Sequence, residues 1–336
     1  METPMSTAAN TTSEVTDMDA GRLHVVLGAG AGAGGAIVRE LVGQGRRVRA
    51  VTRGGNSAAS YGTLPPASFE DVAADVTERE QLRRALDGAA VVYHCVQPAY
   101  TRWPQEFPAM TRGIMEATAA AGAKLVFADN LYMYGPVDGP MTEQTPPVAQ
   151  TRKGKVCAAM AAELLEADRD GRLRVVIGRS SDFFGPGGLN SAIGERFFKA
   201  LLAGKKTQWF ADLDQPHTMS YLPDMARAFV TLGERPEADG QVWHTPAAKA
   251  LTGRQYIELA ARVAGTPAKP AVIGPGTVRL VGLFMPVLRE LPELMYQYER
   301  PFVMDASKFE AAFGPFAVTP PEEALRTTLA WYRGRA

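Results

Sequence analysis

The stretch VVLGAGAGAGGAIVREL, from Val25 to Leu41, decides the fold of this chain. An apolar run is followed by five glycines within eight residues, and then by a helix-like pattern. Glycine adopts the positive φ of a tight turn at little cost. Without a Cβ, it also lets a pyrophosphate approach the backbone N–H groups at a helix N-terminus. The pattern therefore predicts a strand, a dinucleotide-binding turn and a helix, with a plain glycine turn as the alternative.

Several glycine spacings fit this turn. GxGxxG fits Gly30, Gly32 and Gly35, whereas GxxxGxG fits Gly28, Gly32 and Gly34. A third spacing, GxxGxxG, places Ala31 between Gly28 and Gly34. The predicted cofactor contacts of the turn are Gly28, Gly30, Ala31, Gly32, Ala33 and Gly34.

Short apolar runs then alternate with helix-like segments as far as residue 182. Such alternation predicts parallel strands joined by right-handed crossovers. The runs VVL, AVVY, KLVF and VVI are continuous, as strands buried on both faces require. We predict an α/β fold, a doubly wound parallel Rossmann sheet with a smaller, mixed substrate-binding lobe from the C-terminal half.

The predicted domain boundaries follow from changes in residue composition and in the pattern of apolar runs along the chain. Residues 1–20 are rich in Thr, Ser, Ala and acids, and predict a disordered tail. Residues 21–182 predict the dinucleotide-binding Rossmann domain. Residues 183–336 are more turn-rich, and predict a substrate-binding lobe with some segments returning to the Rossmann sheet.

Composition excludes several classes of protein. The formal net charge is +0, and no basic stripe favours a nucleic-acid partner. No apolar run is long enough to span a bilayer. Two distant cysteines favour a reducing compartment, so we expect a cytoplasmic protein, and four scattered histidines indicate no metal site.

The expected end of the second strand bears on the choice of cofactor. NAD-binding enzymes usually place an acid there, whereas this chain has Thr52 and Arg53. An arginine would pair with a 2′-phosphate, which predicts NADP (NADPH) rather than NAD; a solvated surface arginine is the alternative. Asp75, after the third strand, could bind the adenine amino group or only cap the next helix.

From about Arg22 to near the C-terminus, the chain resembles the short-chain dehydrogenase/reductase superfamily, in its extended NAD(P)-dependent epimerase/dehydratase branch. Besides the glycines, the resemblance rests on AAVVYHCVQPAY, KLVFADNLYMYGP, IGRSSDFFGPG, HTMSYLPDMARAFVTLGE and MDASKFEAAFG. It implies an oxidoreductase or an epimerase/dehydratase with a Ser/Thr–Tyr–Lys catalytic set. The further cofactor contacts expected on this basis are Val76, Val96, Lys155, Arg179 and Ser180.

The chain departs from that catalytic set. Asn130 occupies the serine position, Lys155 the lysine position and Thr151 the tyrosine position, so the usual phenol is missing. Two residues from Asn130, Tyr132 points the same way along an extended chain and could present its hydroxyl. The predicted catalytic residues are therefore Lys155, Asn130, Tyr132 and Thr151. The alternatives are a packed aromatic for Tyr132, an exposed lysine for Lys155 and a turn residue for Asn130.

Predicted substrate contacts are Tyr100, Trp103, Tyr132 and His217. Aromatic residues after the fourth strand suit an apolar or ring-shaped substrate, although they could equally anchor the loop. Two functions stay open. One is an NADP-dependent enzyme acting by hydride transfer on a small, apolar carbonyl or enone substrate. The other is a non-catalytic NADP-binding redox sensor or assembly factor. A homodimer through the two helices beside the fifth strand is also expected.

Overall fold

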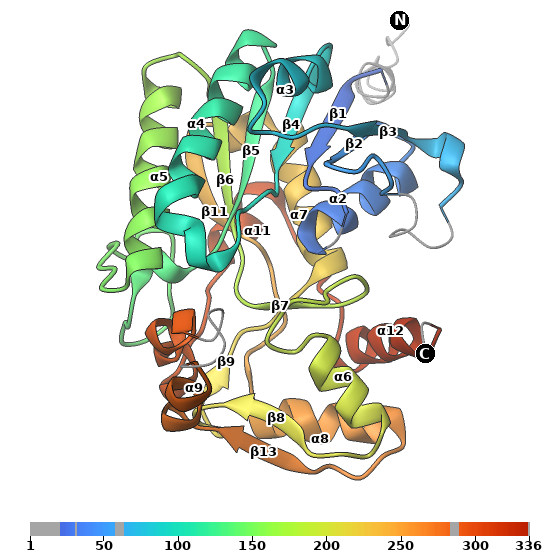
Figure 1. Ribbon diagram of the computed structural model, residues 1–336, viewed down its shortest axis with the longest axis vertical. Helices are drawn as coiled ribbons and strands as arrows, with labels where there is room; N and C mark the ends of the chain where they lie inside the picture. The colour runs from blue at the N-terminus through green and yellow to red at the C-terminus, as the bar shows by residue number, and fades with distance from the viewer. Residues whose placement is uncertain (1–20, 31, 58–63, 283–288, 335–336) are drawn as a thin grey trace, which may run out of the picture.

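The computed structural model describes residues 21–30, 32–57, 64–282 and 289–334. The predicted tail, residues 1–20, and Ala31 lie outside the described residues. The chain forms a parallel sheet flanked by helices, with a smaller lobe below it (Figure 1). No helix among the described residues combines the length and the apolar character needed to cross a membrane.

The central sheet has seven strands in the order β11-β6-β5-β4-β1-β2-β3, and every neighbouring pair is parallel. The predicted doubly wound parallel sheet is therefore confirmed. Chain order reverses between β1 and β4, which leaves a crevice at their carboxyl ends. The strands are β1 (Leu23–Leu27), β2 (Arg47–Thr52), β3 (Glu70–Ala73), β4 (Ala89–His94), β5 (Lys124–Asp129), β6 (Arg174–Arg179) and β11 (Gln241–His244).

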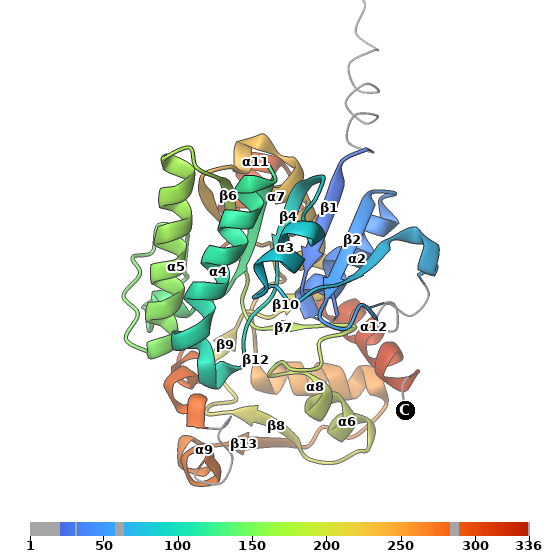
Figure 2. The ribbon, with the colours of Figure 1, turned by 45° about the horizontal axis from the view of Figure 1, so that its top comes forward.

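Helices cover both faces of this sheet because its strands are apolar on both sides. One face carries α3 (Arg79–Ala85), α4 (Trp103–Ala120) and α5 (Arg152–Arg169). The other carries α2 (Gly32–Gly43), α7 (Leu222–Glu234) and α11 (Ser307–Phe313). Figure 2 shows α4 and α5 side by side along one edge of the molecule.

The C-terminal half contributes to both parts of the molecule. Its β11 pairs with β6 in the central sheet, so a segment beyond residue 182 does return there. The lobe has its own apolar core, which includes Phe198, Trp209, Tyr256 and Leu325. The domain boundary at residue 182 stays a prediction. The remaining strands are β7 (Phe183–Phe184), β8 (Thr207–Phe210), β9 (Pro216–His217), β10 (Ser220–Tyr221), β12 (Leu251–Thr252) and β13 (Pro270–Ile273). The remaining α-helices are α6 (Glu195–Leu202), α8 (Gly253–Ala264), α9 (Pro275–Gly282), α10 (Tyr296–Glu299) and α12 (Pro321–Arg333).

Candidate functional site

The glycine turn lies between β1 and α2, where the sequence predicts a dinucleotide pyrophosphate. Gly28 has a φ of +83°, and a Cβ there would lie 2.9 Å from the Cys95 carbonyl oxygen. A Cβ on Gly34 would lie 2.3 Å from the Gly28 carbonyl oxygen. These two glycines let the helix start close to the strand and keep Cβ atoms out of the turn, while the N–H groups of Gly28 and Ala29 donate to the Val51 carbonyl oxygen at 3.0 and 3.2 Å. The turn therefore fits a pyrophosphate at the N-terminus of α2.

A second loop contacts the same helix. The Gly32 N–H donates to the Gly187 carbonyl at 3.2 Å. The Arg39 guanidinium donates to the Pro186 carbonyl at 3.0 Å. The turn after β7 thus lies directly against the first turns of α2.

The end of β2 carries the predicted ribose contact. Arg53 is exposed there and follows Thr52, whose hydroxyl accepts a hydrogen bond from the Gly55 N–H at 3.0 Å. Asp75 accepts two hydrogen bonds from Thr77, one from its N–H at 2.9 Å and one from its hydroxyl at 2.7 Å. These bonds, assisted by the charge of Arg53, lower the pKa of Asp75. Asp75 therefore stabilises the turn before α3, and its adenine contact stays a prediction.

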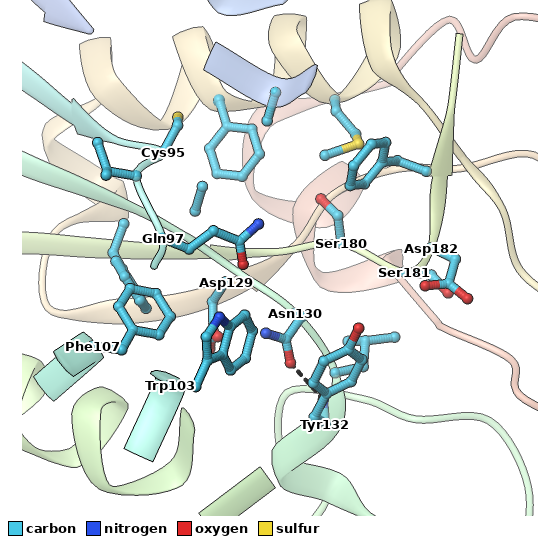
Figure 3. A pocket seen from close by; sticks show the side chains of 18 of the residues that line it. Cys95, Gln97, Trp103, Phe107, Asp129, Asn130, Tyr132, Ser180, Ser181 and Asp182 are labelled. Carbon is cyan, nitrogen blue, oxygen red and sulfur yellow. Dashed lines mark hydrogen bonds between the residues drawn. The ribbon is translucent and has the colours of Figure 1, made fainter. Parts of the chain in front are cut away.

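A cavity of about 120 Å³ opens at the carboxyl ends of β4, β5 and β6 (Figure 3). Four predicted site residues that line it are Tyr100, Trp103, Asn130 and Tyr132. The predicted cofactor contacts Ala33, Val96 and Ser180 line it as well. Val76 instead lies in the apolar core on the side of α3.

Two tyrosines meet in the cavity wall. The hydroxyls of Tyr100 and Tyr132 are 2.9 Å apart. The Tyr132 N–H donates to Oδ1 of Asn130 at 2.8 Å, which fixes the strand exit. Burial raises the pKa of Tyr100 to about 12 and that of Tyr132 well above its ordinary value. Both phenols therefore stay protonated near neutral pH.

The structure does not bring Lys155 or Thr151 to this cavity. Lys155 is exposed, because it lies on the outer side of α5. Thr151 is the N-cap of α5, and its hydroxyl accepts from the Gly154 N–H at 3.0 Å. Neither residue is among those that line the cavity, and the catalytic and cofactor roles given to them stay predictions.

Lys153 is the buried lysine of this helix, and sequence reasoning passed over it. Its ammonium pairs with Glu290 and, at 2.7 Å, with Glu293. It also lies 5.3 Å from the centroid of the Tyr100 ring. The two carboxylates come from a segment far along the chain, so no local pattern announces this cluster.

Arg179 turns away from the cavity. Its Nε donates to Asp129 at 3.0 Å, and Nη1 donates to the Tyr134 hydroxyl at 2.8 Å. The same hydroxyl is 2.8 Å from Nε2 of His244. This buried network supports the end of β6, and the cofactor contact of Arg179 stays a prediction.

Behind the cavity, His217 is buried and does not line it. Its Nε2 lies 3.2 Å from Asp182, and the Tyr298 hydroxyl donates to the same carboxylate. Burial raises the pKa of Asp182, but the hydrogen bond and charge of His217 and the Tyr298 bond outweigh it and lower the pKa. Asp182 is therefore an ionised carboxylate on the cavity wall. It directly follows the Ser180-Ser181 pair at the exit of β6, and the sequence reasoning did not single it out.

No group of three or more His, Cys, Asp or Glu side chains in the described part of the chain is arranged to hold a metal ion.

Residues 24–244 match the model of the NAD dependent epimerase/dehydratase family. No curated protein matches the chain.

Solved structures with the same fold cover almost the whole chain. A nucleoside-diphosphate-sugar epimerase from Pseudomonas aeruginosa has a TM-score of 0.76 at 19% identity, over 94% of this chain and 99% of its own. UDP-glucuronic acid 4-epimerase from Bacillus cereus, in complex with NAD, has a TM-score of 0.76 at 16% identity, over 93% and 99%. MoeE5, in complex with UDP-glucose and NAD, has a TM-score of 0.72 at 22% identity, over 94% and 99%. At these identities the likeness establishes the fold.

Proposed function

Since this chain belongs to the NAD dependent epimerase/dehydratase family, we propose that it is an NADP-dependent oxidoreductase acting on a small, apolar carbonyl or enone substrate. The observation that carries this proposal is the bare glycine turn at the start of α2, with an aromatic-walled cavity at the carboxyl ends of the adjacent strands. When bound, the nicotinamide supplies or accepts the hydride. The residues of the chain bind, orient and move the proton.

The preference for NADP rests on the end of β2. Exposed Arg53 offers a guanidinium that can form a bidentate pair with a 2′-phosphate. No carboxylate occurs at this strand end to bind the ribose hydroxyls of NAD. Two of the structural relatives named above are complexes with NAD, so the two cofactors must be compared directly.

Calorimetric titration of wild type and Arg53→Ala with NADP and NAD compares them. We expect wild type to bind NADP at least tenfold more tightly, because one charge-assisted pair is worth about 1.5–3 kcal/mol. Arg53→Ala should lose that difference. Arg47→Ala, which removes an exposed arginine from the same strand, should keep it. Equal affinities in wild type would contradict the preference.

Tyr132 is the proposed proton donor to the substrate oxygen. Its hydroxyl is in the cavity wall beside that of Tyr100, and its raised pKa keeps the O–H bond intact. A protonated phenol can donate a hydrogen bond to an oxygen that gains negative charge as hydride arrives at carbon. Asn130 fixes the backbone of Tyr132 and is its positioning residue.

Turnover across a panel of ketones, enones and nucleotide sugars, read as nicotinamide absorbance, tests this assignment. We expect Tyr132→Phe to lower kcat by about 10²–10⁴, as expected for loss of a general acid, with little change in cofactor affinity. An unimpaired Tyr132→Phe enzyme would remove Tyr132 from the chemistry.

A second function is a non-catalytic, NADP-binding redox sensor or assembly factor. The observation that favours it is Thr151 capping α5 where the family resemblance implies a phenol, with Lys155 in solvent. Tight NADP binding without turnover on any class of the panel would support the sensor and contradict the enzyme. In either case we propose a cytoplasmic protein, consistent with the free thiols Cys95 and Cys157.

A further inference from the structure

In the Asp182 carboxylate, Oδ2 contacts other protein groups, whereas Oδ1 faces the cavity without a protein donor among the described residues. The Tyr298 hydroxyl and Nε2 of His217 both meet Oδ2. No side chain or backbone N–H among the described residues donates to Oδ1. Because Asp182 lines the cavity, Oδ1 is the oxygen available to a bound molecule.

His217 fixes this orientation. Its Nδ1 lies 3.0 Å from the Gln297 carbonyl oxygen, and its Nε2 lies 3.2 Å from Asp182. Both ring nitrogens therefore lie close to an oxygen atom of the protein. The ring also stacks on Tyr298 and Phe302, with centroids 4.6 and 5.1 Å apart. The aromatic contacts and the two polar contacts hold the carboxylate against the cavity.

The rest of the cavity wall carries no cation. Among the described residues that line it there is no Lys, Arg or His, and Asp129, the other acid, is paired with Arg179 behind the wall. The nearby Lys153 is neutralised by Glu290 and Glu293. Aromatic side chains form much of the wall, namely Tyr100, Trp103, Phe107, Phe127, Tyr132, Phe183, Phe229 and Phe302.

The ionised Asp182 carboxylate and the absence of cations among the described lining residues favour a neutral or positively charged substrate over an anionic one. A diphosphate requires cations or several hydrogen-bond donors, and an ionised carboxylate repels it. A hydroxyl or an ammonium group donates to a carboxylate, and an ammonium also gains from aromatic faces. A hydrogen-bond donor on an apolar body therefore matches this wall, whereas a phosphate does not.

We propose that Oδ1 of Asp182 anchors a hydrogen-bond-donating group of the substrate, a hydroxyl or an ammonium, on an apolar or aromatic body, and that the cavity rejects nucleotide diphosphate sugars. The proposal deepens the proposed function and rests on it, since it takes this cavity as the substrate site. It separates this chain from the structural relative that is a complex with UDP-glucose.

Calorimetric titration of the full chain saturated with NADPH, at pH 7.5, tests the proposal with probes that share one body. These are 2-phenylethylamine, 2-phenylethanol and 3-phenylpropionate, with UDP-glucose as the diphosphate. We expect the amine and the alcohol to bind at least tenfold more tightly than the carboxylate, and UDP-glucose not to compete with them. An amine that binds more tightly than the alcohol would identify a cationic substrate, and the reverse order would identify a hydroxyl.

Asp182→Asn keeps the shape of the side chain and removes its charge. It should reduce the difference between the amine and 3-phenylpropionate to less than threefold. The matched control Asp138→Asn changes an exposed aspartate that has no partner among the described residues, and should leave the wild-type order unchanged. If Asp182→Asn does not fold, the wild-type series decides alone.

Two results would overturn the proposal. One is that 3-phenylpropionate or UDP-glucose binds as tightly as the amine and the alcohol. The other is that none of the four probes binds while NADPH does. Failure of NADPH itself to bind would instead refute the proposed function, so the two failures are distinguishable.

Discussion

Gly34 has tighter surroundings than Gly28, Gly30 or Gly32 in the nucleotide-binding turn. Its missing Cβ would lie 2.3 Å from the Gly28 carbonyl oxygen, and neither backbone segment can move without disturbing β1. We expect Gly34→Ala to lower the free energy of unfolding by about 1–3 kcal/mol, as overpacking usually does. It should also weaken NADPH binding at least tenfold. Denaturant unfolding and calorimetry measure the two effects.

Gly43 gives the matched control for that substitution. It lies at the other end of α2, and a Cβ there would have no heavy atom within 4 Å. Gly43→Ala should therefore raise stability, by up to about 1 kcal/mol through helix propensity, and leave NADPH binding unchanged. Similar effects of the two substitutions would contradict the close packing of α2 on the turn.

His94 predicts a pH dependence of stability. It is buried beside Phe127, and burial lowers its pKa to about 3. Between that pKa and the unfolded value of about 6.5, only the unfolded state binds the proton, so stability falls as the pH decreases. From pH 7 to pH 5 the loss is about 2 kcal/mol. Burial lowers the pKa of His244 as well, which adds to the loss in the same direction.

Urea unfolding of wild type and His94→Gln at pH 7 and pH 5 measures this contribution. His94→Gln is less stable at pH 7, because it disturbs the packing, but its stability should fall less between the two pH values. The same slope in both proteins would show that His94 titrates normally in the folded state.

Some of the individual residues that line the cavity could be predicted from the sequence. Asn130 and Tyr132 were expected from the two-residue period of an extended chain, and both line the cavity, but the chain leaves the extended conformation at Leu131 (φ −105°, ψ 7°) and Tyr132 begins a 3-10 helix. Tyr100 and Trp103 were expected from their place after β4. Asp182 was missed because its importance depends on His217 and Tyr298, which only the fold brings to it. Contacts between residues so far apart in the chain produce no recognisable pattern in the local sequence.

Among the elements, α5 shows why the choice of lysine could not be made from the sequence. Lys153 and Lys155 are two residues apart and therefore point to different sides of the helix. The predicted lysine, Lys155, faces solvent, and Lys153 faces Glu290 and Glu293. Aligning this helix with a family motif fixes the position of the lysine only to within a residue or two. An error of two residues is enough to exchange the buried side of the helix for the exposed side.

The two lysines should differ sharply in their effect on stability. Lys153→Ala leaves two partly buried carboxylates without their ammonium, and should cost about 3 kcal/mol of unfolding free energy. Lys155→Ala, on the exposed side, should stay within about 0.5 kcal/mol of wild type. Thermal or urea unfolding compares them, and equal effects would contradict the buried ion cluster.

The elements of the first half were predictable because their apolar runs are continuous and their turns carry glycine. The elements of the lobe were not, since β8 and β13 are short strands from distant segments, and within the described part of the chain they pair only with each other. The return of β11 to the sheet was expected in general terms, but its position beside β6 depends on contacts across the whole chain.

For the whole molecule, we predict a homodimer through α4 and α5. The two helices run side by side along one edge of the molecule (Figure 2). Ala159 is exposed on α5. Light scattering should give about twice the 36.1 kDa of one chain. Ala159→Arg should give monomers, whereas Ala330→Arg, on the exposed side of α12, should not. A monomeric wild type would contradict the prediction.

The hydrogen bond from the Gly32 N–H to the Gly187 carbonyl has a consequence for how the protein is made. The ribosome synthesises about 5–20 residues per second, so the glycine turn emerges early in translation. Gly187, the hydrogen-bond partner of the first turn of α2, emerges only after most strands of the central sheet. The edge strand β11 emerges later still. A nascent chain stalled before residue 187 should therefore bind NADPH poorly, and the ability to capture the cofactor should arise late in translation.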